Sequence, residues 1–85
     1  MRVLIPSALR SYTESAWAEA GGATLGAVLD ELERLYPGIR FRMIDEQNRI
    51  RPHIRFFVGG VQARDMAQAL KPTDELLIVQ ALSGG

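Results

Sequence analysis

The carboxyl end of this chain carries the most distinctive chemistry in the sequence. It closes on two glycines, Gly84 and Gly85, which follow Leu82 and Ser83 after an apolar segment. Because glycine has no β-carbon, such an end can pass through a narrow channel and present a single group, the α-carboxylate. The five residues beyond Gln80 span roughly 16 Å when extended, which is enough to reach into the active site of another protein. We therefore interpret the carboxylate of Gly85 as the candidate reactive group.

Chemistry at a carboxylate needs an activator, because its oxygens are poor leaving groups. The chain offers no nucleotide cradle for this task, since Gly21-Gly22 and Gly59-Gly60 lack phosphate-loop spacing and a following Lys-Ser or Lys-Thr. It has no cysteine, which excludes a disulfide framework, a thiolate nucleophile and a cysteine metal site. The serines lack a base partner, and the lone His53 favours a structural role. We expect no catalytic residue, no metal site and no bound cofactor.

Size and charge indicate one small domain. The 85 residues suit a single modest core. A formal net charge of zero gives no general case for binding nucleic acid or an anionic membrane. The charge is uneven, however, because residues 1–39 hold three arginines against five carboxylates and residues 40–85 compensate. The amino end is too short for a signal peptide and no apolar run could span a bilayer, so we expect a cytoplasmic protein.

The elements that must position the carboxyl end begin with an amphipathic helix over residues 24–36. Side chains at the i, i+3, i+4, i+7 spacing of a one-sided helix are Leu25, Val28, Leu29, Leu32 and Tyr36. Thr24 is a suitable N-cap, and Pro37-Gly38 stops the helix. Since no second long helix can receive the apolar face, that face must pack on a sheet.

Strand patterns surround this helix, and Gly59-Gly60 marks a hairpin turn. Alternation and turn signals predict strands at residues 2–7, 14–20, 54–58, 61–64 and 75–80. Residues 8–13 are predicted as a connection and 65–70 as one helical turn, whereas 39–52 fit either a short hairpin or a short helix followed by a loop. The first and last strands can lie side by side. We therefore predict an α+β fold, the β-grasp, with a mixed four- or five-stranded sheet and one main helix across one face.

This arrangement resembles the ubiquitin-like small sulfur carriers of the MoaD/ThiS family over nearly the whole chain. The segments that carry the likeness are RVLIP at 2–6, ATLGAVL at 23–29, YPG at 36–38, IRFFVGG at 54–60, and DELLIV at 74–79 running into ALSGG at 81–85. They are fairly specific only together with the glycine end. Gly59 departs from the asparagine that the family often has there, a conservative change for a turn. We expect a β-grasp domain over residues 1–81 and a flexible tail over 82–85.

The resemblance implies that an ATP-dependent, ubiquitin-activating-like enzyme adenylates the carboxylate of Gly85, which then becomes a thiocarboxylate. Leu82, Ser83 and Gly84 would enter the partner with it. The partner would use ATP, a sulfur donor protein would supply sulfur, and a downstream acceptor enzyme would pass it to molybdopterin, thiamin, cysteine or a tRNA base. With no cysteine, the chain cannot hold sulfur as a persulfide. It would be a protein co-substrate rather than an enzyme, or the small subunit of a molybdopterin synthase-like complex.

Strand alternation also predicts a surface for the partner. The set expected to face the helix is Val3, Ile5, Phe56, Val58, Leu76 and Ile78. The set expected on the opposite face is Leu4, Phe57, Leu77 and Val79. A contiguous exposed apolar patch marks a protein-binding site, and the resemblance implies that it contacts the activating enzyme. The competing interpretation is a second core, or a face covered by residues 39–52.

Two other function classes fit the sequence. A protein modifier would join Gly85 to lysines of targets through an isopeptide bond; its own Lys71 is the only side-chain amine, which restricts self-chains to that residue or the amino terminus. A plain β-grasp binding module would carry an inert tail. The arginines within residues 40–55 are interrupted by Asp45 and Glu46, which favours a solvated face, or a rim against an acidic partner surface, over RNA binding. We expect no nucleic-acid partner and no membrane partner.

Overall fold

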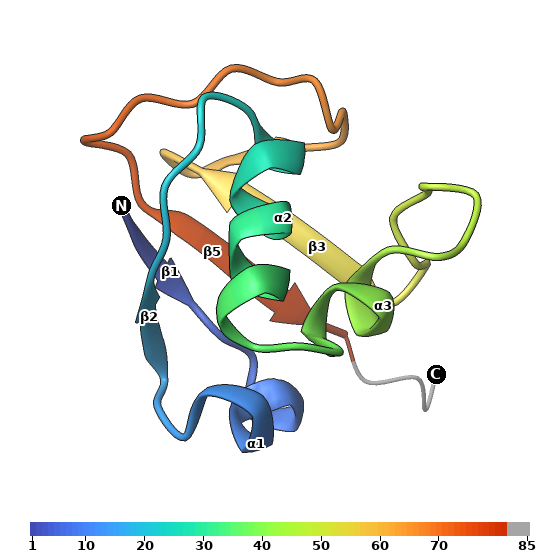
Figure 1. Ribbon diagram of the computed structural model, residues 1–85. Helices are drawn as coiled ribbons and strands as arrows, with labels where there is room; N and C mark the ends of the chain where they lie inside the picture. Colours follow the sequence, from blue (N-terminus) through green and yellow to red (C-terminus); the bar gives the residue numbers. More distant parts are fainter. Residues whose placement is uncertain (82–85) are drawn as a thin grey trace.

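The last strand of the chain occupies the centre of the sheet (Figure 1). The computed structural model describes residues 1–81. Its five-stranded sheet has the order β2-β1-β5-β3-β4, with β1 parallel to β5 and the other neighbouring pairs antiparallel. The strands are β1 (Arg2–Leu4), β2 (Trp17–Glu19), β3 (Ile54–Val58), β4 (Val61–Ala63) and β5 (Leu76–Gln80). The predicted mixed sheet, with the first and last strands adjacent, is confirmed.

One main helix, α2 (Leu25–Leu35), lies across one face of this sheet (Figure 1). Its fully buried side chains are Leu25, Val28, Leu29 and Leu32, as the spacing predicts. The Thr24 hydroxyl accepts the N–H of Ala27 at 3.1 Å, which makes Thr24 the N-cap. The predicted helix is therefore confirmed, with the cap at the predicted residue.

The core lies between α2 and the sheet. The strands and the residue that follows β1 contribute the buried side chains Val3, Ile5, Ala18, Ile54, Phe56, Ala63, Leu76 and Ile78. Val58, predicted for the same side, is only partly buried and packs against the margin of this cluster. No polar or charged side chain is buried among residues 1–81. The core is therefore held by apolar packing, and the opposite face of the sheet is left without a helix.

The first strand is shorter than predicted. β1 ends at Leu4, because Pro6 has no N–H with which to continue the ladder. The N–H of Ile5 still donates to the carbonyl of Ala16 at 2.8 Å. The chain then forms two short helical segments, η1 (Ser7–Leu9) and α1 (Arg10–Thr13), where a plain connection was expected.

The second strand begins later than predicted for a related reason. Glu14 adopts a left-handed conformation with φ of 56° and caps α1. A residue in that conformation cannot start an extended strand, so β2 begins at Trp17 rather than at residue 14.

Residues 65–70 form turns instead of the predicted helical turn. Their carbonyls point to the amino end of α2: Gln68 accepts the N–H of Leu25 at 3.0 Å, and Met66 accepts the N–H of Gly26 at 2.8 Å. These N–H groups have no partner inside the helix. Residues 65–70 therefore supply hydrogen-bond acceptors to α2 instead of forming a helical turn of their own. A β-carbon at position 26 would lie 3.2 Å from the Met66 carbonyl oxygen, which explains a glycine there.

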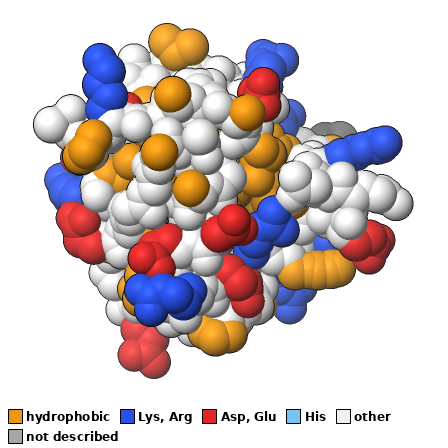
Figure 2. Space-filling view, turned by 45° about the horizontal axis from the view of Figure 1, so that its top comes forward, with side chains coloured by type: hydrophobic (Ala, Val, Ile, Leu, Met, Phe, Trp, Pro, Cys, Tyr) orange, Lys and Arg blue, Asp and Glu red, His pale blue; other side chains and the backbone are white. Residues whose placement is uncertain are grey.

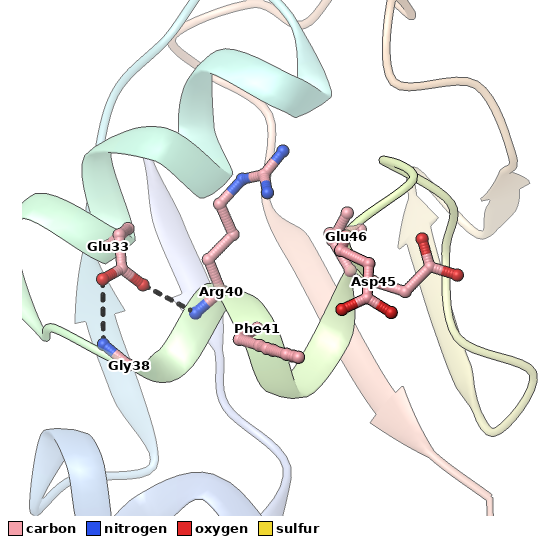
Figure 3. A pocket seen from close by; sticks show the side chains of 7 residues that line it. Glu33, Gly38, Arg40, Phe41, Asp45 and Glu46 are labelled. Atoms are coloured by element: carbon pink, nitrogen blue, oxygen red, sulfur yellow. Dashed lines mark hydrogen bonds between the residues drawn. The ribbon is translucent and has the colours of Figure 1, made fainter.

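Residues 39–52 begin with the short helix α3 (Ile39–Met43) and continue as a loop, so the helix alternative is the correct one. One side chain of α2 organises its start. The Glu33 carboxylate accepts the N–H of Gly38 at 2.9 Å and that of Arg40 at 3.0 Å (Figure 3). Gly38 has φ of 99°, which a glycine adopts without strain. Glu33 thus satisfies donors that α3 cannot satisfy itself.

The surface shown in Figure 2 carries red and blue side chains interspersed, with smaller hydrophobic areas between them. Acidic and basic groups are mixed on this face, so it presents no broad area of one charge. Within the described chain, the helices fall short of the length and apolar character needed to cross a membrane.

Replacing Glu33 with glutamine should destabilise the domain at neutral pH. Hydrogen bonds from the main-chain N–H of Gly38, and then of Arg40, hold the pKa of the Glu33 carboxyl below its usual value. A lowered folded pKa stabilises the fold above the unfolded pKa of about 4.3, and this contribution is lost as pH falls through the folded pKa. We expect E33Q to cost about 1 kcal/mol at pH 7, or roughly 4–8 °C in Tm.

Thermal melts of E33Q and wild type at pH 7 and pH 3 check this. The difference in Tm should narrow at pH 3, where wild type also loses the charge. The control is E46Q, which removes an exposed carboxylate of the following loop. An E33Q defect that is equal at both pH values would contradict the assigned role.

Candidate functional site

The sheet holds the main chain as far as Ala81, just before the predicted reactive end begins. Gln80 lies opposite Ile54 in the β5–β3 ladder, and the N–H of Ala81 donates to the carbonyl of His53 at 2.7 Å. His53 therefore has a structural main-chain contact at the root of the carboxyl end, in agreement with its expected structural use. The predicted tail residues Leu82, Ser83, Gly84 and Gly85 lie outside the described residues.

The predicted partner surface forms a row across three strands. Leu4 is the partner of Leu77 in the parallel ladder, and Leu77 is the partner of Phe57 in the antiparallel ladder. Side chains paired in this way share one face of the sheet. Leu4, Phe57 and Leu77 are partly exposed, and Val79 next along β5 is 41% exposed. The structure brings the four residues together on the face opposite α2; their contact with a partner stays a prediction.

Residues 39–52, the alternative cover for this face, pack elsewhere. Among them, Ile39, Met43 and Ile44 are fully buried in the core cluster that includes α2. The row formed by Leu4, Leu77, Phe57 and Val79, here called the open-face row, is thus accessible in the described chain.

The hairpin register adds residues to this face that the sequence reasoning missed. Trp17 lies opposite Leu4 and extends the open-face row onto β2. The guanidinium carbon of Arg2 stacks 3.9 Å from the centre of the Trp17 ring, and Arg2 also pairs with Glu75 at 3.0 Å. Alternation along residues 14–20 separates Trp17 from the buried Ala18 and Ala20, but only the pairing with β1 shows that Trp17 lies beside Leu4.

A hollow beside α3 is lined by three carboxylates, and two of them, Glu33 and Asp45, hold the backbone (Figure 3). Both oxygens of Glu33 accept main-chain N–H groups, and Asp45 accepts those of Gln47 and Arg49 at 2.9 Å each. Within residues 1–81, no group of three His, Cys, Asp or Glu side chains is arranged to hold a metal ion. The most distinctive arrangement in the described chain is therefore an apolar face on the sheet, next to the central strand from which the chain continues toward Gly85.

Comparison with known proteins identifies the family and the fold. A model of the ThiS family matches residues 3–85. The sulfur carrier protein CysO of Mycobacterium tuberculosis is 34% identical over 89 residues, which cover 98% of this chain and 96% of that protein. The crystal structure of M. tuberculosis CysO, an antigen, has a TM-score of 0.88 at 30% identity and covers 95% of this chain and 98% of its own.

Two further structures share the fold. A chain of the Amycolatopsis orientalis BexX/CysO complex has a TM-score of 0.89 at 30% identity, covering 99% of this chain and 98% of that chain. SAMP1 from Haloferax volcanii has a TM-score of 0.80 at 26% identity, covering 100% and 98%. These similarities confirm the ubiquitin-like β-grasp. Since the family model spans nearly the whole sequence, the chain belongs to the ThiS family and is a homologue of sulfur carrier proteins.

Proposed function

We propose that this protein is a sulfur carrier and that its reactive group is the carboxylate of Gly85. The observation that supports this most directly is the placement of the chain end. In a member of the ThiS family, the central strand β5 leads through Ala81 to a Gly84-Gly85 terminus. The relatives whose name is sulfur carrier protein share this length and fold.

The proposed chemistry has two steps, both in partner active sites. A carboxylate oxygen of Gly85 attacks the α-phosphorus of ATP in an ATP-dependent activating enzyme, which gives an acyl-adenylate and releases pyrophosphate. A hydrosulfide equivalent from a sulfur donor protein then attacks the acyl carbon. A carbon–sulfur bond forms, the bond to AMP breaks, and a thiocarboxylate remains. The carrier is a co-substrate in this scheme, and a downstream acceptor enzyme consumes the sulfur.

Features of this chain fit a scheme in which partner enzymes carry out the chemistry and this chain carries the sulfur. It has no cysteine to hold sulfur in another form. Its open-face row offers an apolar surface beside the strand that leads to the tail, so one partner could bind the row and the tail together. The partner binds ATP, and because activation requires ATP we place the protein in the cytoplasm.

Deleting Gly85 should abolish activation while leaving the fold intact. The shortened chain still ends in a carboxylate, but that group lies about 3.5 Å short of its position. Misplacing a reacting group by about 1 Å can already cost about 100-fold in rate, so we expect at least that loss. ATP–pyrophosphate exchange catalysed by the activating enzyme of the same organism measures it. The control K71R should retain normal exchange, and normal exchange by the deletion variant would contradict the proposal.

Placing a charge in the open-face row should weaken activation through binding. Phe57 lies in the middle of the row beside Leu77, so F57E puts a carboxylate where an apolar contact is expected. We expect the KM for the carrier to rise about tenfold in the exchange assay, a typical effect for an apolar anchor. V61E is the matched control, because Val61 is 67% exposed on the edge strand β4 and is the ladder partner of Val58 on the helix side. Equal KM values for F57E and V61E, with both variants folded, would remove the row from the interface.

Protein modification is a second candidate, and one observation favours it. The fold matches that of H. volcanii SAMP1, whose full name is small archaeal modifier protein 1. An activated Gly85 carboxyl could form an isopeptide bond with a lysine of a target, and this use can coexist with sulfur transfer. Glycine-glycine remnants on lysines of other proteins in the same cells would be its mark.

A further inference from the structure

A basic pocket adjoins the root of the tail. It has a volume of about 520 Å³ and is lined by Phe41, Arg42, Arg51 and His53. The carbonyl of His53 is the group that accepts the Ala81 N–H at 2.7 Å. The pocket, here called the tail-root pocket, therefore lies where the chain leaves β5, on a different part of the molecule from the open-face row.

The two arginines of the tail-root pocket are held in place by neutral acceptors. Arg51 donates from Nε to the carbonyl of Phe41 at 2.7 Å, and its guanidinium carbon lies 4.5 Å from the centre of the Phe41 ring. Arg42 donates from Nε to the hydroxyl of Tyr12 at 2.9 Å. Each contact uses one side of the guanidinium fork. Further N–H donors of each group are therefore left to bind something else.

Within residues 1–81, neither arginine forms an ion pair. The four ion pairs among residues 1–81 engage Arg2, Arg34, Arg40 and the amino terminus, and none engages Arg42, Arg51 or Arg55. Phe41, which is 49% exposed, lines both this pocket and the neighbouring hollow, where Glu33 and Asp45 accept main-chain N–H groups. Arg10, Arg49 and Arg64 also lie outside these ion pairs, so what distinguishes Arg42 and Arg51 is their shared position in the tail-root pocket.

Arg55 carries this positive charge toward the open-face row. It lies opposite Val79 in the β3–β5 ladder, and its guanidinium donates to the carbonyls of Pro52 and Ile54. Arg55 thus places a positive charge next to Val79 of the open-face row, on the strand that begins directly after His53 of the pocket.

We propose that the tail-root pocket, together with Arg55, binds carboxylate side chains of the protein that receives the tail. This rests on the proposed function, because the receiving protein is the activating enzyme. Guanidinium groups with free donors match the planar geometry of carboxylates. Positive charge at the entry point would also steer the tail toward an acidic channel mouth and raise the rate of encounter. The occupant is an acidic protein surface.

A binding experiment with a defined acidic probe tests the pocket independently of any enzyme. Hexaglutamate peptide is titrated into the isotope-labelled full chain, and NMR shifts are followed at low salt and at about 0.5 M salt. We expect the largest shifts at the side chains of Arg42 and Arg51 and the amides of His53 and Ala81, with loss at high salt. The largest shifts elsewhere, or none, would overturn the proposal. Arginine side-chain shifts on deletion of residues 82–85 alone, with no response to peptide, would show that the chain's own carboxylate is the occupant, and would also overturn it.

Kinetics with the activating enzyme tests the consequence. For R42Q/R51Q we expect the KM for the carrier to rise about tenfold at low salt with kcat unchanged, and the salt dependence of KM to shrink. R42K/R51K keeps the charge but not the planar fork, so it should restore the salt dependence of KM and only part of the binding. R34Q is the control, because it removes the same charge from an arginine already paired with Glu31.

The outcomes separate this inference from the proposed function. A wild-type KM for R42Q/R51Q with normal exchange would overturn the proposal that the tail-root pocket binds the partner. It would leave the proposed carrier function standing. A KM defect of R42Q/R51Q that does not change with salt would show that the arginines act only on structure and would overturn the proposal for the pocket as well. If wild type itself supports no exchange, the proposed function fails, and the peptide titration still decides the pocket.

Discussion

The structure depends on the pairing of β5 on both of its sides. Leu76 and Leu77 pair with Val3 and Leu4 in parallel, while the whole strand pairs with β3 in antiparallel. A strand at the centre of a sheet can be displaced only by breaking two ladders, so the sheet holds the chain firmly until Ala81. This anchoring fixes the position of Ala81, from which the chain continues to its last residues.

The same pairing gives the two faces of the sheet different uses. Side chains of β5 that point toward α2, Leu76 and Ile78, are fully buried. The alternate side chains, Leu77 and Val79, join the open-face row. Because the alternation is strict, a residue that stabilises the core is always next to one that is free to contact a partner. The side chains that stabilise the core and those that we propose to contact a partner are thus separate residues of one strand.

Much of this could be predicted from the sequence, since helix and strand periodicity are local properties. The helix at residues 24–36, its Thr24 cap and the outward set on β1, β3 and β5 follow from spacing alone. The first hairpin was less accessible, because its true bounds depend on Pro6 and on the left-handed Glu14. The turn at residues 65–70 was missed because its carbonyls satisfy N–H groups of α2, a contact between segments far apart in the sequence. The neutral partners of Arg42 and Arg51 likewise come from Tyr12 and Phe41, which no local pattern indicates.

We propose that this fold exists to present the Gly85 carboxylate for activation and sulfur loading. The most direct measurement is mass spectrometry of the intact chain isolated from its own cells, followed by fragmentation. The account predicts a form in which one terminal oxygen is replaced by sulfur, with the added mass placed on Gly85. Oxidation of Met1, Met43 or Met66 adds nearly the same mass, so the fragments must separate these sites. Added mass found only on methionine, in cells whose activating enzyme and sulfur donor are active, would contradict the account.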